Sequence, residues 1–239
     1  MVQRPFYERD GTCQVYVLHP PGGVVGGDEL ELGATLGAGA RALLTTPAAS
    51  KIYASQRHRA QQRQRFSIAA GASLEWLPQE TIVYDGARFH GELSVELAPG
   101  AHFSGWEITC IGRDAHGFRG GEYSQRWLLS RGERPLWGER AAFRGDDPFL
   151  TAAWGLAGRP VTGTFVSTGA DPSLADTIRE ELDGSDESWT SVSCMRDVLV
   201  ARYLGYSAEA AKRAFARAWA HVRRSTQGRS AEAPRIWAT

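Results

Sequence analysis

Three times in the first half of the chain, a small-residue turn that contains a glycine–alanine pair follows one strand-like run and precedes another. The pairs are Gly39-Ala40, Gly71-Ala72 and Gly100-Ala101, at intervals of 32 and 29 residues. A unit of about thirty residues with one apolar face cannot bury that face alone, so successive units must stack. The spacing predicts a degenerate repeat that builds stacked β-sheets in a helical, solenoid-like arrangement.

Strand-like residues continue from Gln14 to Phe143, in runs such as 15–18, 42–45, 92–97 and 103–108. Eight tryptophans and 27 glycines suit aromatic-rich sheets joined by tight turns. The fold class is therefore mostly β. We expect one domain over residues 1–239, β-rich over 1–170 and helix-containing over 171–239.

Two helices are expected in the C-terminal part. One begins at Pro172, with apolar residues every fourth position, and a strand is favoured over 198–204. The second helix is capped by Ser207 and carries an apolar stripe that includes Phe215 and Trp219. The tail 234–239 is apolar enough to dock on the rest of the chain.

Composition narrows the classes of partner and compartment. The 27 basic and 27 acidic residues cancel, which disfavours nucleic acid and anionic membranes as partners. Three widely spaced cysteines fit reduced thiols, and no run approaches the roughly 18 apolar residues that span a bilayer. With no signal peptide after Met1, a cytoplasmic location is expected.

The sequence lacks the common catalytic signatures. It contains no Gly-x-x-x-x-Gly-Lys-Ser/Thr, His-Glu-x-x-His, Gly-x-Ser-x-Gly or Cys-x-x-Cys, and its six histidines are scattered. These absences favour a protein that is not an enzyme and holds no permanent cofactor.

A glycine-rich loop from Pro20 to Asp28 is the most distinctive local feature. Its backbone could cradle an anion, but Asp28 and Glu31 would repel one. Two interpretations stay open: a purely structural turn, or a loop that presents Asp28 and Glu31 to a cation.

Several charged residues lie in apolar surroundings, which are small residues around Lys51 and large ones around the carboxylates. They are Lys51, Glu75, Glu80, Asp85 and Glu107. Lys51 is either an internal ion partner or a surface lysine. The carboxylates could form a glycoside-hydrolysing pair, line an interior that offers oxygen ligands to a passing cation, or pair with arginines such as Arg113 or Arg140.

Six strings, in order along nearly the whole chain, resemble the UreD (also called UreH) family of urease accessory proteins. They comprise residues 2–6, 18–28, 45–53, 74–87, 105–107 with Gly112-Arg113, and 234–239. The resemblance implies a solenoid-like stack of β-sheets with C-terminal helices, which agrees with the repeats and helices above.

The resemblance also implies a function in loading nickel into urease. Such a protein is a metallochaperone scaffold that binds a UreF-type protein directly, a UreG-type GTPase through UreF, and apo-urease. Transient Ni²⁺ would follow an internal path. The path residues it suggests are Asp28, Glu31, Glu80, Asp85, Glu107 and Glu139, with Lys51 as an ion partner. For partner binding we expect exposed apolar residues of the C-terminal part instead, namely Tyr203, Phe215, Trp219 and Trp237.

Family members usually carry some tens of residues before the Val2–Phe6 segment, so we expect a truncated N-terminus. Two alternatives remain: a carbohydrate-active β-solenoid enzyme that uses two of Glu75, Glu80, Asp85 and Glu107 in an open groove, and a plain interaction module without a metal function.

Overall fold

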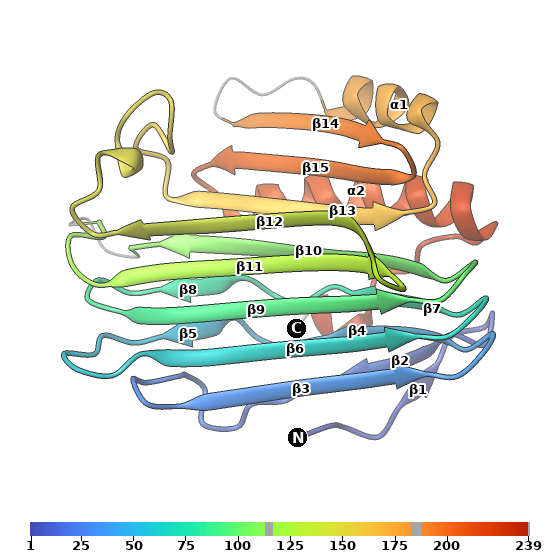
Figure 1. Cartoon of the computed structure of the whole chain (residues 1–239), viewed down its shortest axis with the longest axis horizontal. Helices are drawn as coiled ribbons and strands as arrows, with labels where there is room; N and C mark the ends of the chain where they lie inside the picture. Colours follow the sequence, from blue (N-terminus) through green and yellow to red (C-terminus); the bar gives the residue numbers. More distant parts are fainter. Residues whose placement is uncertain (113–116, 183–187, 239) are drawn as a thin grey trace.

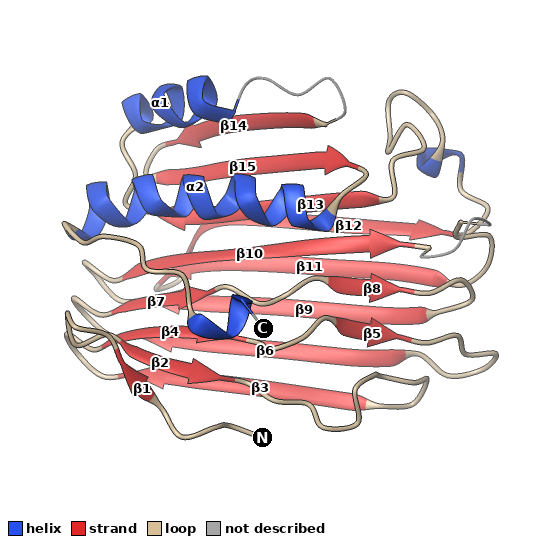
Figure 2. Cartoon of the chain, turned by 180° about the vertical axis from the view of Figure 1, so that it is seen from behind, coloured by secondary structure: helices blue, strands red, loops and turns tan. Residues whose placement is uncertain are grey.

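Two β-sheets face each other, and helices cover the outer side of one of them (Figures 1 and 2). The computed structural model describes residues 1–112, 117–182 and 188–238. Arg113 and Thr239, which belong to two of the family-like strings, lie outside these ranges. Within the described ranges, neither α-helix is long and apolar enough to cross a membrane.

The back sheet has ten strands and the front sheet five. The back sheet runs in the order β1 (Phe6–Tyr7), β2 (Cys13–Tyr16), β4 (Arg41–Thr45), β7 (Ser73–Trp76), β10 (His102–Ile111), β13 (Val161–Thr168), β15 (Val198–Gly205) and β14 (Trp189–Met195), while β5 (Ser50–Ile52) and β8 (Thr81–Val83) extend it beside β10. The front sheet runs β12 (Arg134–Arg144), β11 (Glu122–Arg131), β9 (Arg88–Leu97), β6 (Ala60–Ile68) and β3 (Glu29–Leu36).

From β2 to β11 the chain alternates between the sheets, so that each coil contributes to both (Figure 1). Pairing between successive coils is parallel, and Arg41 faces Ser73, which faces His102. Those offsets are the 32- and 29-residue intervals of the Gly-Ala pairs. Gly39, Gly71 and Gly100 sit in equivalent front-to-back turns at φ of 69°, 67° and 71°, a region that favours glycine. The predicted repeat and solenoid-like arrangement are confirmed.

Burial differs between the sheets because only one has both faces covered. Strand β9 alternates, with Phe89, Leu93 and Val95 facing inward and polar residues outward. All four residues of β7 are buried, because the front sheet covers one face and helix α2 the other.

The predicted helices form in the expected places. Helix α1 spans Pro172–Leu182 and α2 spans Ala208–Gln227, where Ser207 accepts a hydrogen bond from the Ala210 N–H. Figure 2 shows α2 lying across β10, β13 and β15. The predicted strand over 198–204 is β15, and β14 pairs with it; that the chain is one domain stays a prediction.

The C-terminal tail docks on the back sheet, as its apolar residues predict. A short 3₁₀ helix, η2 (Arg235–Ala238), places the Trp237 ring 5.5 Å from Trp106 and 6.0 Å from Trp219. The Trp237 indole donates to Thr45 Oγ1 at 2.9 Å. A second 3₁₀ helix, η1 (Pro148–Leu150), follows β12.

Candidate functional site

Two cavities lie between the sheets and share three lining residues, Glu107, Gln125 and Trp127. The first cavity has a volume of about 690 Å³ and reaches the surface at Met1, which is 80% exposed. The second, of about 650 Å³, reaches it at Trp154, which is 75% exposed. We refer to the two cavities together as the interior passage, and Glu107 lies where they adjoin.

Glu107 points into this passage from β10, because its neighbours Trp106 and Ile108 pack on the opposite, helix-covered face. Its carboxylate accepts hydrogen bonds from the Trp127 indole at 3.1 Å and the Tyr123 hydroxyl at 3.3 Å. Burial raises the pKa of Glu107 to about 7, although the two hydrogen bonds oppose the rise. The carboxylate is therefore poised to exchange a proton near neutral pH.

Other predicted path residues lie on either side of Glu107. Lys51 and Glu80 line the first cavity, and Lys51 has no carboxylate within ion-pair distance among the described residues. Glu139 lines the second, where it accepts from Thr164 Oγ1 at 3.1 Å and pairs with Arg202. The fold thus spaces single carboxylates along the passage.

The remaining predicted path residues lie elsewhere or at its edge. Asp28 closes the glycine loop by accepting the Val25 N–H at 2.9 Å, and it lines neither cavity. Asp85 accepts the backbone N–H groups of Arg119 and Gly120, both at 2.7 Å, which lowers its pKa. Glu31 borders the first cavity, but its carboxylate is 62% exposed and lies 3.7 Å from Arg63. The geometry assigns Asp28 and Asp85 structural contacts.

The residues predicted to bind a partner are mostly buried within the chain. Tyr203, Phe215 and Trp219 are at most 3% exposed, and Trp237 in the tail is half-buried against Trp106 and Trp219. The expectation that the apolar stripe of the helix is exposed is wrong, because α2 packs this stripe against β10 and β13. Binding of a partner by this region stays a prediction.

Of the four carboxylates of the glycosidase alternative, Glu80 and Glu107 line the same cavity. The other two do not join them, because Glu75 faces α2 and Asp85 sits in a turn. Among the described residues, no three His, Cys, Asp or Glu side chains come together as a metal cage. Isolated carboxylates offer an ion weak oxygen contacts that it can leave.

The sequence patterns did not predict a buried ionic network that lies beneath α2. Arg223 is fully buried, 2.8 Å from Glu8 and 3.3 Å from Glu75, and Arg229 lies 3.0 Å from Asp10. Burial raises the pKa of Glu75, and Arg223 offsets part of that rise. Arg223, a basic residue inside the apolar stripe of α2, was the sequence signal for this network.

The sequence patterns also did not identify Gln125 as a residue of the candidate site. Its Oε1 atom is buried without a hydrogen-bond partner among the described residues, at the junction of the cavities. An alternating strand signals that Gln125 shares a face with Trp127, but only the packed sheets show that this face borders a passage.

The fold and its interior define a class of protein: a β-solenoid with two cavities between its sheets, into which isolated carboxylates point. Comparison with known proteins gives the family. The family model described as UreD urease accessory protein matches residues 1–238. Urease accessory protein UreD 2 of Brucella anthropi is 44% identical over 242 residues, covering 100% of this chain and 88% of that protein.

Two further relatives give the same result. Urease accessory protein UreD of Dechloromonas aromatica is 44% identical over 245 residues, covering 100% of this chain and 85% of the relative. That of Methylobacillus flagellatus is 42% identical over 243 residues, with the same coverage of 100% and 85%. The chain belongs to the UreD urease accessory protein family, and the resemblance carried by the six strings is confirmed.

Proposed function

We propose that the chain is a non-enzymatic scaffold that passes Ni²⁺ through its interior toward apo-urease. In this proposal it binds a UreF-type protein directly and a UreG-type GTPase through that protein. The observation that carries the proposal is the position of Glu107, the single carboxylate shared by the two cavities.

The contacts along the passage suit transfer better than storage. An ion entering at Glu80 would meet Glu107 at the junction and Glu139 beyond it. Each position offers one carboxylate, so no step holds the ion as a cage of His and Cys ligands would. Arg202 on Glu139 adds a competing positive charge, which further shortens the residence of a cation there.

The direct test is urease activation in cells that express apo-urease and the UreF- and UreG-type proteins, with and without this chain. Nickel per urease active site is the readout. We expect Glu107→Gln to lower it several-fold while the variant still co-purifies with the UreF-type protein.

Glu96→Gln is the matched control, because Glu96 is exposed on the outer face of β9 and away from both cavities. Wild-type nickel loading by Glu107→Gln would contradict the passage and favour a plain interaction module. Failure to co-purify with the UreF-type protein would contradict the scaffold itself.

A further inference from the structure

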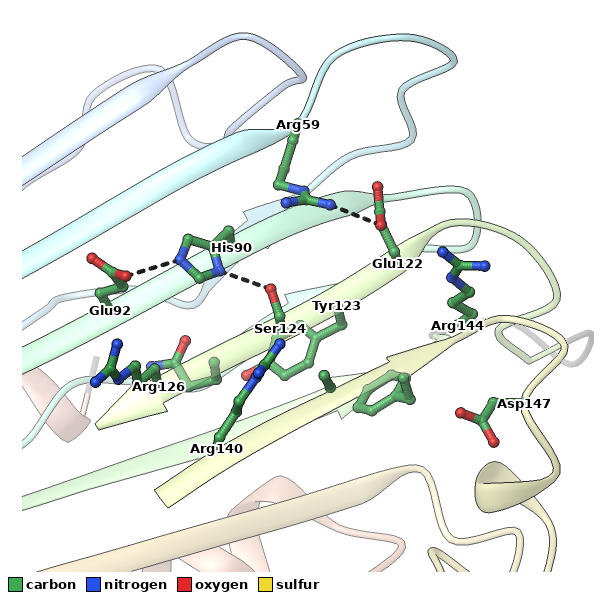
Figure 3. Close-up of a pocket in the computed structure, with 13 residues that line it drawn as sticks. Arg59, His90, Glu92, Glu122, Tyr123, Ser124, Arg126, Arg140, Arg144 and Asp147 are labelled. Carbon is green, nitrogen blue, oxygen red and sulfur yellow. Dashed lines mark hydrogen bonds and ion pairs between the residues drawn. The ribbon is translucent and has the colours of Figure 1, made fainter. Parts of the chain in front are cut away.

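The outer face of the front sheet is open, because the helices cover only the back sheet (Figures 1 and 2). A shallow groove of about 860 Å³ crosses this face over β9, β11 and β12 (Figure 3). Its charged lining comprises Arg59, His90, Glu92, Glu122, Arg126, Arg140, Arg144 and Asp147. Glu107 faces the interior and does not line this groove, whereas Arg140 lines both the groove and the second cavity.

The acidic groups in the groove already have partners. The Glu122 carboxylate forms ion pairs with two arginines, Arg59 at 2.8 Å and Arg88 at 2.6 Å. Glu92 contacts His90 at 3.1 Å, and Asp147 accepts the Phe149 N–H at 2.9 Å. These carboxylates therefore leave the other arginines of the groove without a counter-charge.

Arg126, Arg140 and Arg144 are exposed, and within the described residues no carboxylate lies within ion-pair distance of any of them. Arg126 and Arg140 are directly opposite each other on β11 and β12. Like charges in that position destabilise a sheet. Arg144 lies opposite Glu122, whose carboxylate is taken by Arg59 and Arg88. A ligand that brings negative charge would relieve this repulsion.

We propose that this groove docks an acidic segment of a protein partner, whose carboxylates pair with Arg126, Arg140 and Arg144. The arginine fork matches a carboxylate in two-point hydrogen bonding. Glu92 and Glu122 in the same groove would repel a continuous phosphate backbone, and the chain has no net charge to attract one. The acidic residues of a protein segment can be spaced so that none of them lies next to Glu92 or Glu122.

The test uses the full chain and a fluorescein-labelled synthetic peptide of alternating glutamate and serine. Fluorescence anisotropy is followed at increasing salt. We expect binding that weakens with salt, and a loss of about tenfold in affinity for each of Arg126→Gln, Arg140→Gln and Arg144→Gln. Arg65→Gln is the control, because Arg65 is exposed on the same sheet face but lies 3.6 Å from Glu31.

Thermal unfolding separates docking from a structural role. Removing one arginine of the opposed pair relieves repulsion, so Arg126→Gln and Arg140→Gln should leave the melting temperature unchanged or raised. A fall in melting temperature would overturn the inference. So would equal peptide binding by all variants, no binding at low salt, or tighter binding of a single-stranded oligonucleotide. None of these outcomes depends on nickel transfer.

Discussion

At the scale of single residues, Glu107 shows how a fold changes the chemistry of a common side chain. The sequence marks it as a carboxylate between Trp106 and Ile108, which predicts a buried acid in need of a partner. Its hydrogen bonds to Trp127 and Tyr123 come from β11, more than a dozen residues away in the chain. Pattern alone could not identify these donors, because they belong to the facing sheet.

The raised pKa of Glu107 predicts a pH-dependent stability. A folded-state pKa of about 7, above the ordinary 4.5, means that the folded chain binds the proton more tightly than the unfolded chain. Stability contributed by this group is present below pH 4.5 and is lost as pH rises through 7. Glu107→Gln should therefore gain stability over wild type at pH 8, by at most about 3 kcal/mol, and lose that advantage at pH 4.

Urea unfolding at both pH values measures this difference. Glu96→Gln should show no such change, since Glu96 is exposed. An advantage of Glu107→Gln that is equal at pH 4 and pH 8 would contradict the assigned pKa.

Asp28 tests the two interpretations of the glycine loop. Its side chain accepts the Val25 N–H, and an asparagine oxygen can do the same. We expect Asp28→Ala to lower the free energy of unfolding by about 1 kcal/mol and Asp28→Asn to change it little. Nickel loading by Asp28→Asn should match wild type; a selective loss of loading would instead favour a metal contact.

At the scale of elements, the repeat was predictable because turn chemistry is local. Gly71 has φ of 67°, and an added Cβ would meet no atom within 4 Å, so alanine there would carry only backbone strain. Gly71→Ala should lower the free energy of unfolding by about 1 kcal/mol. Gly37→Ala is the control, because Gly37 has equal space without a positive φ. Equal effects in urea unfolding would contradict this explanation.

The position of helix α2 depends on contacts that its own sequence cannot show. Its caps and stripe predict a helix, but Arg223 joins it to Glu8 near the start of the chain and to Glu75 in β7. Arg223→Met should destabilise the chain by about 3 to 5 kcal/mol, because it leaves buried carboxylates without a counter-charge.

Adding Glu75→Gln to Arg223→Met should recover part of that loss, since one of the unpaired charges is removed. The free energy of urea unfolding is the measurement. A cost below about 1 kcal/mol for Arg223→Met would show that the network is hydrated rather than buried.

At the scale of the whole molecule, the passage exists only because the two sheets face each other and bring together residues that are distant in sequence. Gln125 lies at its junction with an unpartnered buried oxygen. Gln125→Leu should therefore not lower the melting temperature, but it should reduce nickel per urease active site by making the junction apolar. Gln61→Leu, on β6 opposite His90, is the control. Normal loading by Gln125→Leu would place the ion route elsewhere.

The sequence by itself determined the repeat, the strand and helix positions, their caps and the docked tail, because each depends on residues close together in the chain. Its six family-like strings also determined the family. Tertiary structure alone decided which carboxylates face one passage, since the side of a sheet that becomes an interior depends on what packs against it. It brought Lys51, Glu80, Glu107 and Glu139 to the cavities, assigned Asp28 and Asp85 to turns, and buried the helix stripe. The register between strands that are distant in sequence likewise decided which charges are neighbours on the front sheet, because it placed Arg126 between Arg140 on β12 and Glu92 on β9.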